Sequence, residues 1–155
     1  MELQGDSRMK IALVCSHGGH LTEMLYLMEA FRGHEVFFVT YDNFRTRDLP
    51  YPKYLLENIG TNPIKMIKAF FQIGRILAKE KPSVVISTGS EIAIPVFIIA
   101  KVLGIKTIFI ESWCRIKTKS GTGKIVYYLS DLFLVQWPQL LELYGKRAKH
   151  VGAVV

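Results

Sequence analysis

The chain has 155 residues, of which 50% are hydrophobic and 21% are charged. This composition excludes an intrinsically disordered chain and supplies one hydrophobic core, with no room for a second domain. The net charge is +7, and nine of the 20 Lys and Arg residues but only three of the 13 Asp and Glu residues lie in residues 101–155. A basic end on a nearly neutral body favours an anionic ligand, an anionic membrane or nucleic acid as partner.

Residues 1–9 are polar and predict a flexible tail before a single domain over residues 10–155. The longest apolar run, Ile92 to Ala100, is far shorter than the roughly 20 residues of a membrane-spanning helix, so we expect membrane contact to be peripheral. Two cysteines, Cys15 and Cys114, make no disulfide framework and favour a reducing, cytoplasmic setting.

Short apolar runs alternate along the chain with segments of helical periodicity. We predict strands over residues 11–15, 36–40, 54–56, 84–87, 107–110 and 132–135, and helices over residues 21–31, 63–79, 91–103, 123–129 and 138–144. Strands that are apolar on both faces and separated by helices indicate a parallel sheet covered on both sides. With right-handed crossovers this is a single α/β domain with a doubly wound, Rossmann-like sheet, whose ligands bind at the carboxyl ends of the strands.

The first loop at that edge, residues 16–20, joins a strand to a helix. Ser16, Gly18 and Gly19 are candidate phosphate ligands, because glycines let backbone N–H groups approach an anion at a helix N-terminus. A tight turn that simply needs glycine explains them equally well. His20 is a candidate general base, although a histidine that caps or packs the helix is the commoner case. The loop matches neither a dinucleotide fingerprint nor a P-loop, so we expect no cofactor.

The second loop, residues 87–91, repeats this arrangement. Thr88, Gly89 and Ser90 offer hydroxyl and amide donors suited to a phosphate or a sugar. The alternative is an ordinary helix N-cap at Ser90, with Glu91 in the first turn. Two such loops at one sheet edge are better support for a ligand site than either alone.

The third loop begins with Glu111, directly after a buried strand, where a carboxylate is costly unless it is hydrogen-bonded or functional. Arg115 and Lys117 follow it, and a basic loop beside two anion-binding turns suits a pyrophosphate. For the neighbouring Lys119 and Lys124, a solvated surface is the simpler explanation. The chain has no DxD-like motif, so we expect no metal.

The predicted helix over residues 63–79 carries a basic stripe. On a helical wheel the stripe covers about 80° of arc, and it consists of Lys65, Lys68, Gln72, Arg75 and Lys79. The apolar side covers roughly 180°, more than the 100° or so that a sheet-packed helix needs. The excess, led by Met66, Phe70 and Ile73, could enter an anionic membrane interface, or it could pack against neighbouring helices or a partner subunit. The chain has no nucleic-acid recognition motif, so no nucleic acid is expected.

The glycine loop and the third loop together resemble the asparagine-linked-glycosylation-protein-14-like family. The resemblance covers residues 10–155 and rests on Gly18-Gly19-His20 with Leu21 to Met24, on Phe109 to Lys117, on Thr122 to Lys124 and on Val135 to Pro138. It implies a subunit equivalent to the N-terminal, acceptor-binding half of a GT-B glycosyltransferase.

The resemblance also implies a small partner subunit, similar to asparagine-linked glycosylation protein 13, that binds a UDP-sugar, with N-acetylglucosamine as the expected sugar. The two halves would add the second sugar to a polyprenyl-diphosphate-linked sugar at the cytoplasmic face of the membrane, and this chain alone would be inactive. Carried over residue by residue, Gly18, Gly19 and His20 match the acceptor loop, and Thr88 to Ser90 match a second phosphate-facing loop. Glu111 matches the acidic site residue. His17 stands where small residues are usual, which leaves its role open.

Two functions therefore remain open. In the favoured one, His20 or Glu111 activates an acceptor hydroxyl for direct displacement at the anomeric carbon, and the basic loop holds the lipid diphosphate. In the other, the chain is a non-catalytic membrane scaffold that only recruits the catalytic subunit.

Overall fold

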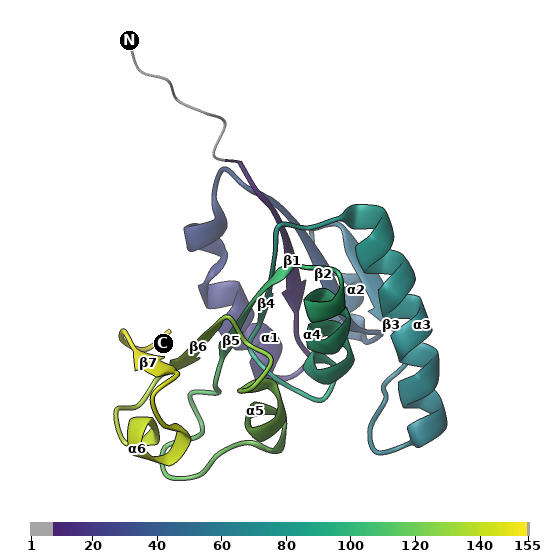
Figure 1. The fold of residues 1–155 in the computed structure, drawn as a ribbon. Helices are drawn as coiled ribbons and strands as arrows, with labels where there is room; N and C mark the ends of the chain where they lie inside the picture. Colours follow the sequence, from purple (N-terminus) through teal and green to yellow (C-terminus); the bar gives the residue numbers. More distant parts are fainter. Residues whose placement is uncertain (1–7, 155) are drawn as a thin grey trace.

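Seven parallel strands form one sheet in the computed structural model, which describes residues 8–154 (Figure 1). The strands are β1 (Lys10–Val14), β2 (Glu35–Tyr41), β3 (Lys53–Leu56), β4 (Val84–Ser87), β5 (Lys106–Ile110), β6 (Leu132–Val135) and β7 (Ala148–His150). Their order across the sheet is β3-β2-β1-β4-β5-β6-β7, and every neighbouring pair is parallel. The predicted doubly wound, Rossmann-like α/β sheet is confirmed.

Helices cover both faces of the sheet, because successive side chains of a strand point to opposite sides. From β1, Ile11 and Leu13 pack into the cluster that includes α1 (Gly19–Tyr26), whereas Ala12 and Val14 pack into the cluster on the opposite face. The helices on that opposite face are α3 (Pro63–Glu80), α4 (Ala93–Val102), α5 (Gly121–Val126) and α6 (Leu140–Tyr144). The remaining short helices are η1 (Met28–Phe31, a 3-10 helix) and α2 (Phe44–Arg47).

The structure differs from the sequence prediction at helix ends and in two short elements. The first predicted helix ends at Tyr26 and continues as η1, and α4 begins at Ala93, later than expected. The sequence pattern does not predict α2 or β7, because both are too short to show a hydrophobic period. Helix α2 is held by a capping box between Asn43 and Thr46, and β7 is a three-residue strand at the sheet edge.

The predicted tail over residues 1–9 lies mostly outside the described residues, which begin at Arg8. Met9 is described, and its N–H donates to Nδ1 of His34 at 3.0 Å. Its carbonyl accepts a hydrogen bond from the N–H of Glu35 at 2.9 Å, so this residue is already held against the start of β2.

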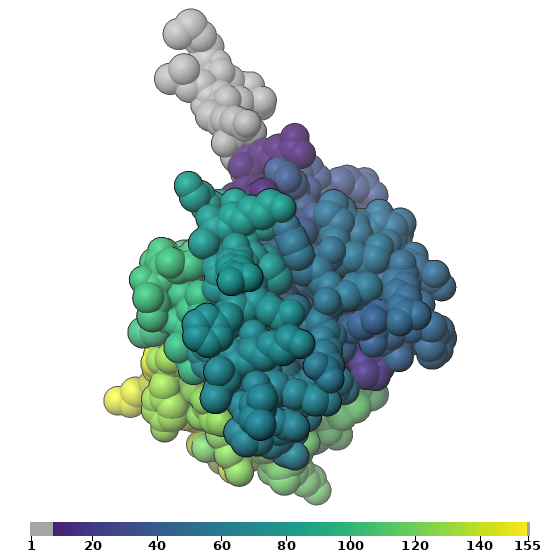
Figure 2. All heavy atoms as spheres, turned by 90° about the vertical axis from the view of Figure 1, so that its right-hand side faces the viewer, coloured from purple at the N-terminus to yellow at the C-terminus, as the bar shows by residue number. Residues whose placement is uncertain are grey.

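Helix α3 turns a different side to the sheet from the one expected. Ile73 is fully buried in the core, so the prediction that it meets a membrane is wrong, and Met66 and Phe70 are only half-exposed. At about 100° per residue, Ile73 projects close to Leu77 and Ala69, which pack in the same core cluster. The strongly exposed apolar side chains of α3 are Ile64, Ile67 and Phe71. Figure 2 faces this side of the molecule, with α3 in teal.

Between residues 8 and 154, no helix is both long enough and apolar enough to cross a membrane.

The winding direction reverses between the adjacent strands β1 and β4. The loops that follow these two strands therefore diverge to opposite faces and open a crevice at the carboxyl edge of the sheet. The first two predicted ligand loops occupy this position, and the third follows β5, the next strand across.

Candidate active site

A pocket of about 640 Å³ lies at this edge. It is lined by residues from α1 and from the loops after β4 and β5, namely Gly19, His20, Thr22, Glu23, Tyr26, Gly89, Ser90, Glu91, Glu111, Ser112, Trp113, Cys114, Arg115, Ser120, Gly121 and Thr122. The structure thus brings together six of the predicted site residues: Gly19, His20, Gly89, Ser90, Glu111 and Arg115. Four others, Ser16, Gly18, Thr88 and Lys117, do not line it.

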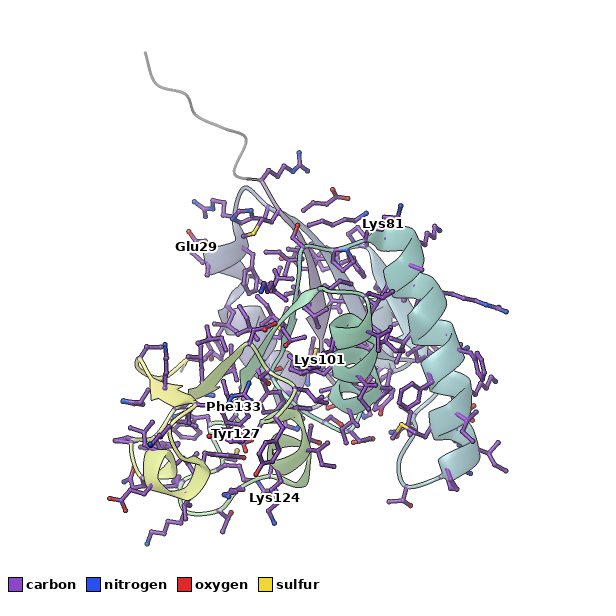
Figure 3. All side chains as sticks on the ribbon, in the orientation of Figure 1. Glu29, Lys81, Lys101, Lys124, Tyr127 and Phe133 are labelled. Atoms are coloured by element: carbon purple, nitrogen blue, oxygen red, sulfur yellow. The ribbon has the colours of Figure 1, made fainter. Side chains whose placement is uncertain are left out.

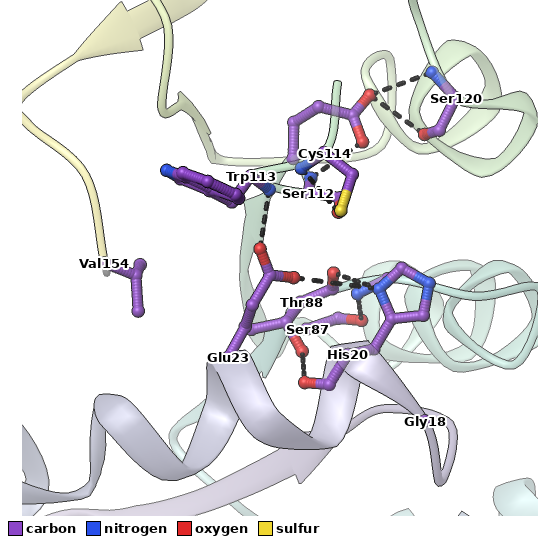
Figure 4. Close-up of polar contacts among 12 residues, drawn as sticks. Gly18, His20, Glu23, Ser87, Thr88, Ser112, Trp113, Cys114, Ser120 and Val154 are labelled. Atoms are coloured by element: carbon purple, nitrogen blue, oxygen red, sulfur yellow. Dashed lines mark hydrogen bonds and ion pairs between the residues drawn. The ribbon is translucent and has the colours of Figure 1, made fainter. Parts of the chain in front are cut away.

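His20 is oriented by the second loop. Its Nδ1 lies 3.0 Å from the carbonyl oxygen of Thr88, and its side chain is 31% exposed (Figure 4). A carbonyl can only accept a hydrogen bond, so the proton of the neutral imidazole is assigned to Nδ1. The other ring nitrogen, Nε2, is then an acceptor, which is the state a general base requires.

Thr88 joins the two loops instead of facing a phosphate. Its side chain is fully buried, and its hydroxyl donates to the carbonyl oxygen of His20 at 2.6 Å. The prediction that this hydroxyl contacts a ligand is therefore wrong, because it is already used inside the protein. Thr88 therefore holds His20 at two points: its hydroxyl bonds the His20 backbone, and its carbonyl bonds the imidazole ring.

Gly89 makes room for the imidazole. Its φ is +130°, and a Cβ built on it would lie 2.7 Å from the His20 ring. Its N–H donates to Oγ of Ser87 at 3.1 Å, so that this amide is also used within the loop. Glycine is required here by both the backbone conformation and the close approach of the ring.

Ser90 does not cap α4. The helix follows an N-cap at Ile92 without a side-chain cap bond, and the Ser90 hydroxyl donates to Glu91 at 2.5 Å. Burial favours the neutral form of Glu91, but hydrogen bonds from Ser90, from its own backbone and from Tyr41 outweigh this and lower its pKa. Glu91 lines the pocket, and its negative charge suits sugar hydroxyls better than phosphate.

Glu111 is buried and held by four hydrogen bonds. Its carboxylate accepts from the N–H of Ser112 at 3.0 Å, from the N–H and the hydroxyl of Ser120 at 3.1 and 2.9 Å, and from the hydroxyl of Tyr144. Burial, and then the hydrogen bond to Glu111, raise the pKa of Tyr144. The Ser120 hydroxyl also receives the N–H of Gly123 at 2.8 Å and so caps α5. Glu111 thus ties both ends of the third loop together.

The wall behind Glu111 is aromatic. Tyr144 packs on Phe133 with ring centroids 4.5 Å apart, and Tyr127 packs edge-on to Phe133 at 5.2 Å (Figure 3). Lys124 points away from this cluster into solvent, as the simpler interpretation of its charge predicted.

The basic part of the third loop is exposed. Arg115 lines the pocket and donates to Oγ1 of Thr118 at 3.3 Å, whereas Lys117 is exposed outside the lining. The base of the loop is fixed by Trp137, whose Nε1 donates to the carbonyl oxygen of Trp113 at 2.6 Å. Arg115 is therefore the basic residue of this loop that lines the pocket, while Nζ of Lys119 lies 5.2 Å from the centre of the Tyr144 ring.

A family model described as "Oligosaccharide biosynthesis protein Alg14 like" matches residues 42–154. The chain belongs to this Alg14-like family. The sequence resemblance is therefore confirmed, and it includes the third loop, α5 and β6.

Individual relatives of this Alg14-like chain carry transferase names. The human UDP-N-acetylglucosamine transferase subunit ALG14 is 38% identical over 86 residues, which are 52% of this chain and 39% of the relative. The mouse subunit is 27% identical over 182 residues, 95% of this chain and 83% of the relative. Among solved structures, MurG of Acinetobacter baumannii matches with a TM-score of 0.77 at 19% identity, over 93% of this chain and 45% of that one. This likeness shows the fold, and the Alg14-like chain spans less than half the length of MurG and of the human relative.

Among the site residues that are missing from the sequence prediction, two organise the site of the Alg14-like chain. Glu23 of α1 is buried and lines the pocket. Arg45 of α2 donates to the carbonyl oxygens of His17 and Gly18 at 3.1 and 3.3 Å and to Oγ1 of Thr22 at 3.2 Å, so that it clamps the glycine loop. An acidic residue one turn after His20 is the only sequence signal for Glu23. The short α2 gives none for Arg45.

The described part of the Alg14-like chain, residues 8–154, holds no cluster of three His, Cys, Asp or Glu side chains that could bind a metal ion.

Replacing Gly89 with alanine is expected to displace the His20 ring, because an added methyl group would overlap it, and to lower the turnover number of the transferase complex proposed below by at least about tenfold. The measurement is steady-state kinetics with a thermal unfolding curve for each variant. Gly33→Ala is the matched control, since Gly33 also has a positive φ, +86°, but nothing lies within 4 Å of its added Cβ. Equal effects of the two substitutions would mean that backbone strain alone is responsible.

Proposed function

We propose that the chain is the acceptor-binding half of a two-subunit UDP-N-acetylglucosamine transferase. In this proposal it adds the second sugar to a polyprenyl-diphosphate-linked sugar, and a separate small subunit binds the UDP-sugar. The observation that carries the proposal is the orientation of His20, whose Nδ1 faces the Thr88 carbonyl while Nε2 is left as an acceptor beside a large pocket. The transferase names of the relatives and the Alg14-like family support the same activity.

The proposed reaction is a direct displacement. The acceptor hydroxyl oxygen attacks the anomeric carbon of the donor sugar, and the bond from that carbon to the UDP oxygen breaks. UDP leaves with the electron pair, and the hydroxyl proton moves to Nε2 of His20. Glu111 is not assigned as the base, because four donors of the protein already bond its carboxylate. Its proposed role is to hold the third loop in place beside the pocket.

The charges of the pocket suggest how the acceptor lies. The carboxylate of Glu91 favours sugar hydroxyls on the side of the second loop. Arg115 favours the diphosphate on the side of the third loop, and the exposed Lys117 adds positive charge nearby. Of the predicted phosphate ligands in the second loop, only Ser90 is therefore reassigned to the sugar, because the Thr88 hydroxyl and the Gly89 N–H are already used inside the protein.

The test is reconstitution of the complex. The chain is co-expressed with a small donor-binding subunit and assayed with UDP-sugars and a polyprenyl-diphosphate-linked acceptor. Formation of a disaccharide by the complex, and by neither subunit alone, is the expected result. Transfer by the isolated chain would contradict the two-subunit proposal, and no transfer by a stable complex would contradict the activity.

The proposal includes peripheral binding to the cytoplasmic face of the membrane through α3. The exposed apolar residues Ile64, Ile67 and Phe71 lie next to the basic stripe, where Lys68 and Arg75 are also exposed. Apolar side chains beside cations match an anionic bilayer interface. A surface that contacts the partner subunit remains the alternative for this helix face.

Replacing Ile67 and Phe71 together with serine is expected to weaken binding to anionic vesicles by at least about tenfold. The two side chains are 59% and 70% exposed, and without them the helix has less apolar surface to insert into the bilayer. The measurement is co-sedimentation with phosphatidylglycerol vesicles, with phosphatidylcholine vesicles for comparison. Val151→Ser, at a position that is 77% exposed and outside α3, is the control. Unchanged vesicle binding with a weakened subunit complex would assign the face to the partner.

A further inference from the structure

The carboxylate of Glu23 is buried with only one of its oxygens in use. Oε1 accepts hydrogen bonds from the N–H of Trp113 at 2.5 Å and from Nε2 of Gln136 at 3.1 Å. Oε2 is buried and has no hydrogen-bond partner. The imidazole of His20 lies next to it, with Nδ1 3.9 Å from Oε2 (Figure 4).

The two donors on Oε1 fix where Oε2 points. Trp113 comes from the third loop and Gln136 from the segment after β6, so both are remote from α1 in sequence. Gln136 is itself held, because its Nε2 also donates to the carbonyl oxygen of Glu111 at 3.0 Å and its Oε1 accepts the N–H of Val154 at 2.9 Å. The carboxylate therefore cannot turn to satisfy Oε2 without losing these bonds.

An unpaired carboxylate oxygen in a buried place costs free energy. The cost falls when a positive charge appears beside it, and among residues 8–154 the group within 4 Å of Oε2 that can gain one is the imidazole of His20. In the neutral ring the Nδ1 proton is bonded to the Thr88 carbonyl. In the imidazolium the ring gains a positive charge, with Nδ1 only 3.9 Å from Oε2.

We propose that Glu23 is a positioning residue for His20: its Oε2 acts with the Thr88 carbonyl to keep the proton of the neutral ring on Nδ1, and it stabilises the imidazolium that forms when Nε2 accepts a proton. The base role of His20 belongs to the proposed function, on which this inference rests. The proton moves from the acceptor hydroxyl to Nε2, while Nδ1 keeps its own proton and Glu23 stays ionised. Glu23 thus resembles the acid of a Ser-His-Asp triad in what it does, although no nucleophilic serine is involved.

The test is Glu23→Gln in the full chain. The glutamine oxygen can keep the Trp113 and Gln136 donors, which turns its NH2 group toward Nδ1 of His20. Nitrogen NMR of the histidine-labelled chain is expected to show His20 with its proton on Nδ1 in the wild type and a mixture of the two tautomers in the variant, because there the glutamine NH2 opposes a proton on Nδ1 while the Thr88 carbonyl still favours it. The His20 signals are assigned by their loss in His20→Gln.

In the two-subunit complex, Glu23→Gln is expected to lower kcat about 10- to 100-fold with little change in KM for the acceptor, less than removal of the base itself. Glu23→Asp keeps the negative charge but moves it farther from the imidazole, because the aspartate side chain is shorter. This variant should retain the Nδ1-protonated tautomer and lose less activity than Glu23→Gln. Glu29→Gln removes an exposed carboxylate on η1 and is the control for net charge.

The NMR readout needs no activity, so it separates this inference from the proposed function. An unchanged tautomer in Glu23→Gln, with the fold retained by circular dichroism, would overturn the positioning role whatever the kinetics show. If Glu23→Gln does not fold, equal kcat values for Glu23→Asp and the wild type would overturn it. If the wild-type complex transfers no sugar, the proposed function fails, while the NMR comparison still decides whether Glu23 controls the His20 proton.

Discussion

Replacing His20 with glutamine is expected to lower kcat of the two-subunit complex about 10²- to 10⁴-fold, the usual contribution of a general base. Glutamine can still donate to the Thr88 carbonyl, which His20 does through Nδ1. It cannot accept the proton of the acceptor hydroxyl. The loss should therefore appear in kcat, with the acceptor KM, the thermal stability and the subunit complex close to those of the wild type.

The control for this substitution is His150→Gln, because His150 is exposed on β7. Sugar transfer is followed with a labelled UDP-sugar, and the complex by co-purification. A variant that forms the complex and transfers sugar at the wild-type rate would support the non-catalytic scaffold, the alternative function for this chain.

Replacing Glu111 with alanine is expected to lower the free energy of unfolding by about 3–5 kcal/mol, the range for breaking a buried charged network. Four donors from Ser112, Ser120 and Tyr144 would lose their acceptor inside the protein. In a domain of this size the melting temperature should fall by roughly 10 °C. Turnover should fall as well, because the third loop forms one wall of the pocket.

Thermal and urea unfolding measure the stability effect. Glu142→Ala is a suitable control, since Glu142 is exposed on α6, the helix that carries Tyr144. If Glu111→Ala melted like the wild type and lost only turnover, the carboxylate would be acting on the substrate, and the assignment of the base to His20 would have to be reconsidered.

The fold and the three loops follow from local patterns. Strands with apolar residues on both faces are recognisable within a few residues, and so are glycines and hydroxyls at their carboxyl ends. The helical wheel of α3 gave the angular positions of its side chains correctly. It could not tell which arc faces the sheet, so Ile73 was predicted at a membrane although it is buried.

The pairing of polar atoms was not predictable in the same way. Thr88 has the residue type and position of a phosphate ligand, yet its hydroxyl bonds His20, 68 residues away. Glu23 has a polar neighbour in Thr22 and would pass for a surface residue. It is buried because Trp113 and Gln136 close over it, and no short segment contains all three. Local sequence therefore locates the ligand edge, whereas long-range contacts decide which atoms remain free for chemistry.

The bond from Val154 to Gln136 has a consequence for the whole site. A backbone N–H can only donate, so it determines which end of the Gln136 amide is oxygen and which is nitrogen. If the amide were reversed, its oxygen would face the carboxylate of Glu23 and the carbonyl of Glu111. Both of these are acceptors, and both now receive hydrogen bonds from the Gln136 nitrogen. The segment at residue 154 thus determines the orientation of the Gln136 amide, and a substitution that displaces Val154 is expected to disturb the Glu23 carboxylate as well.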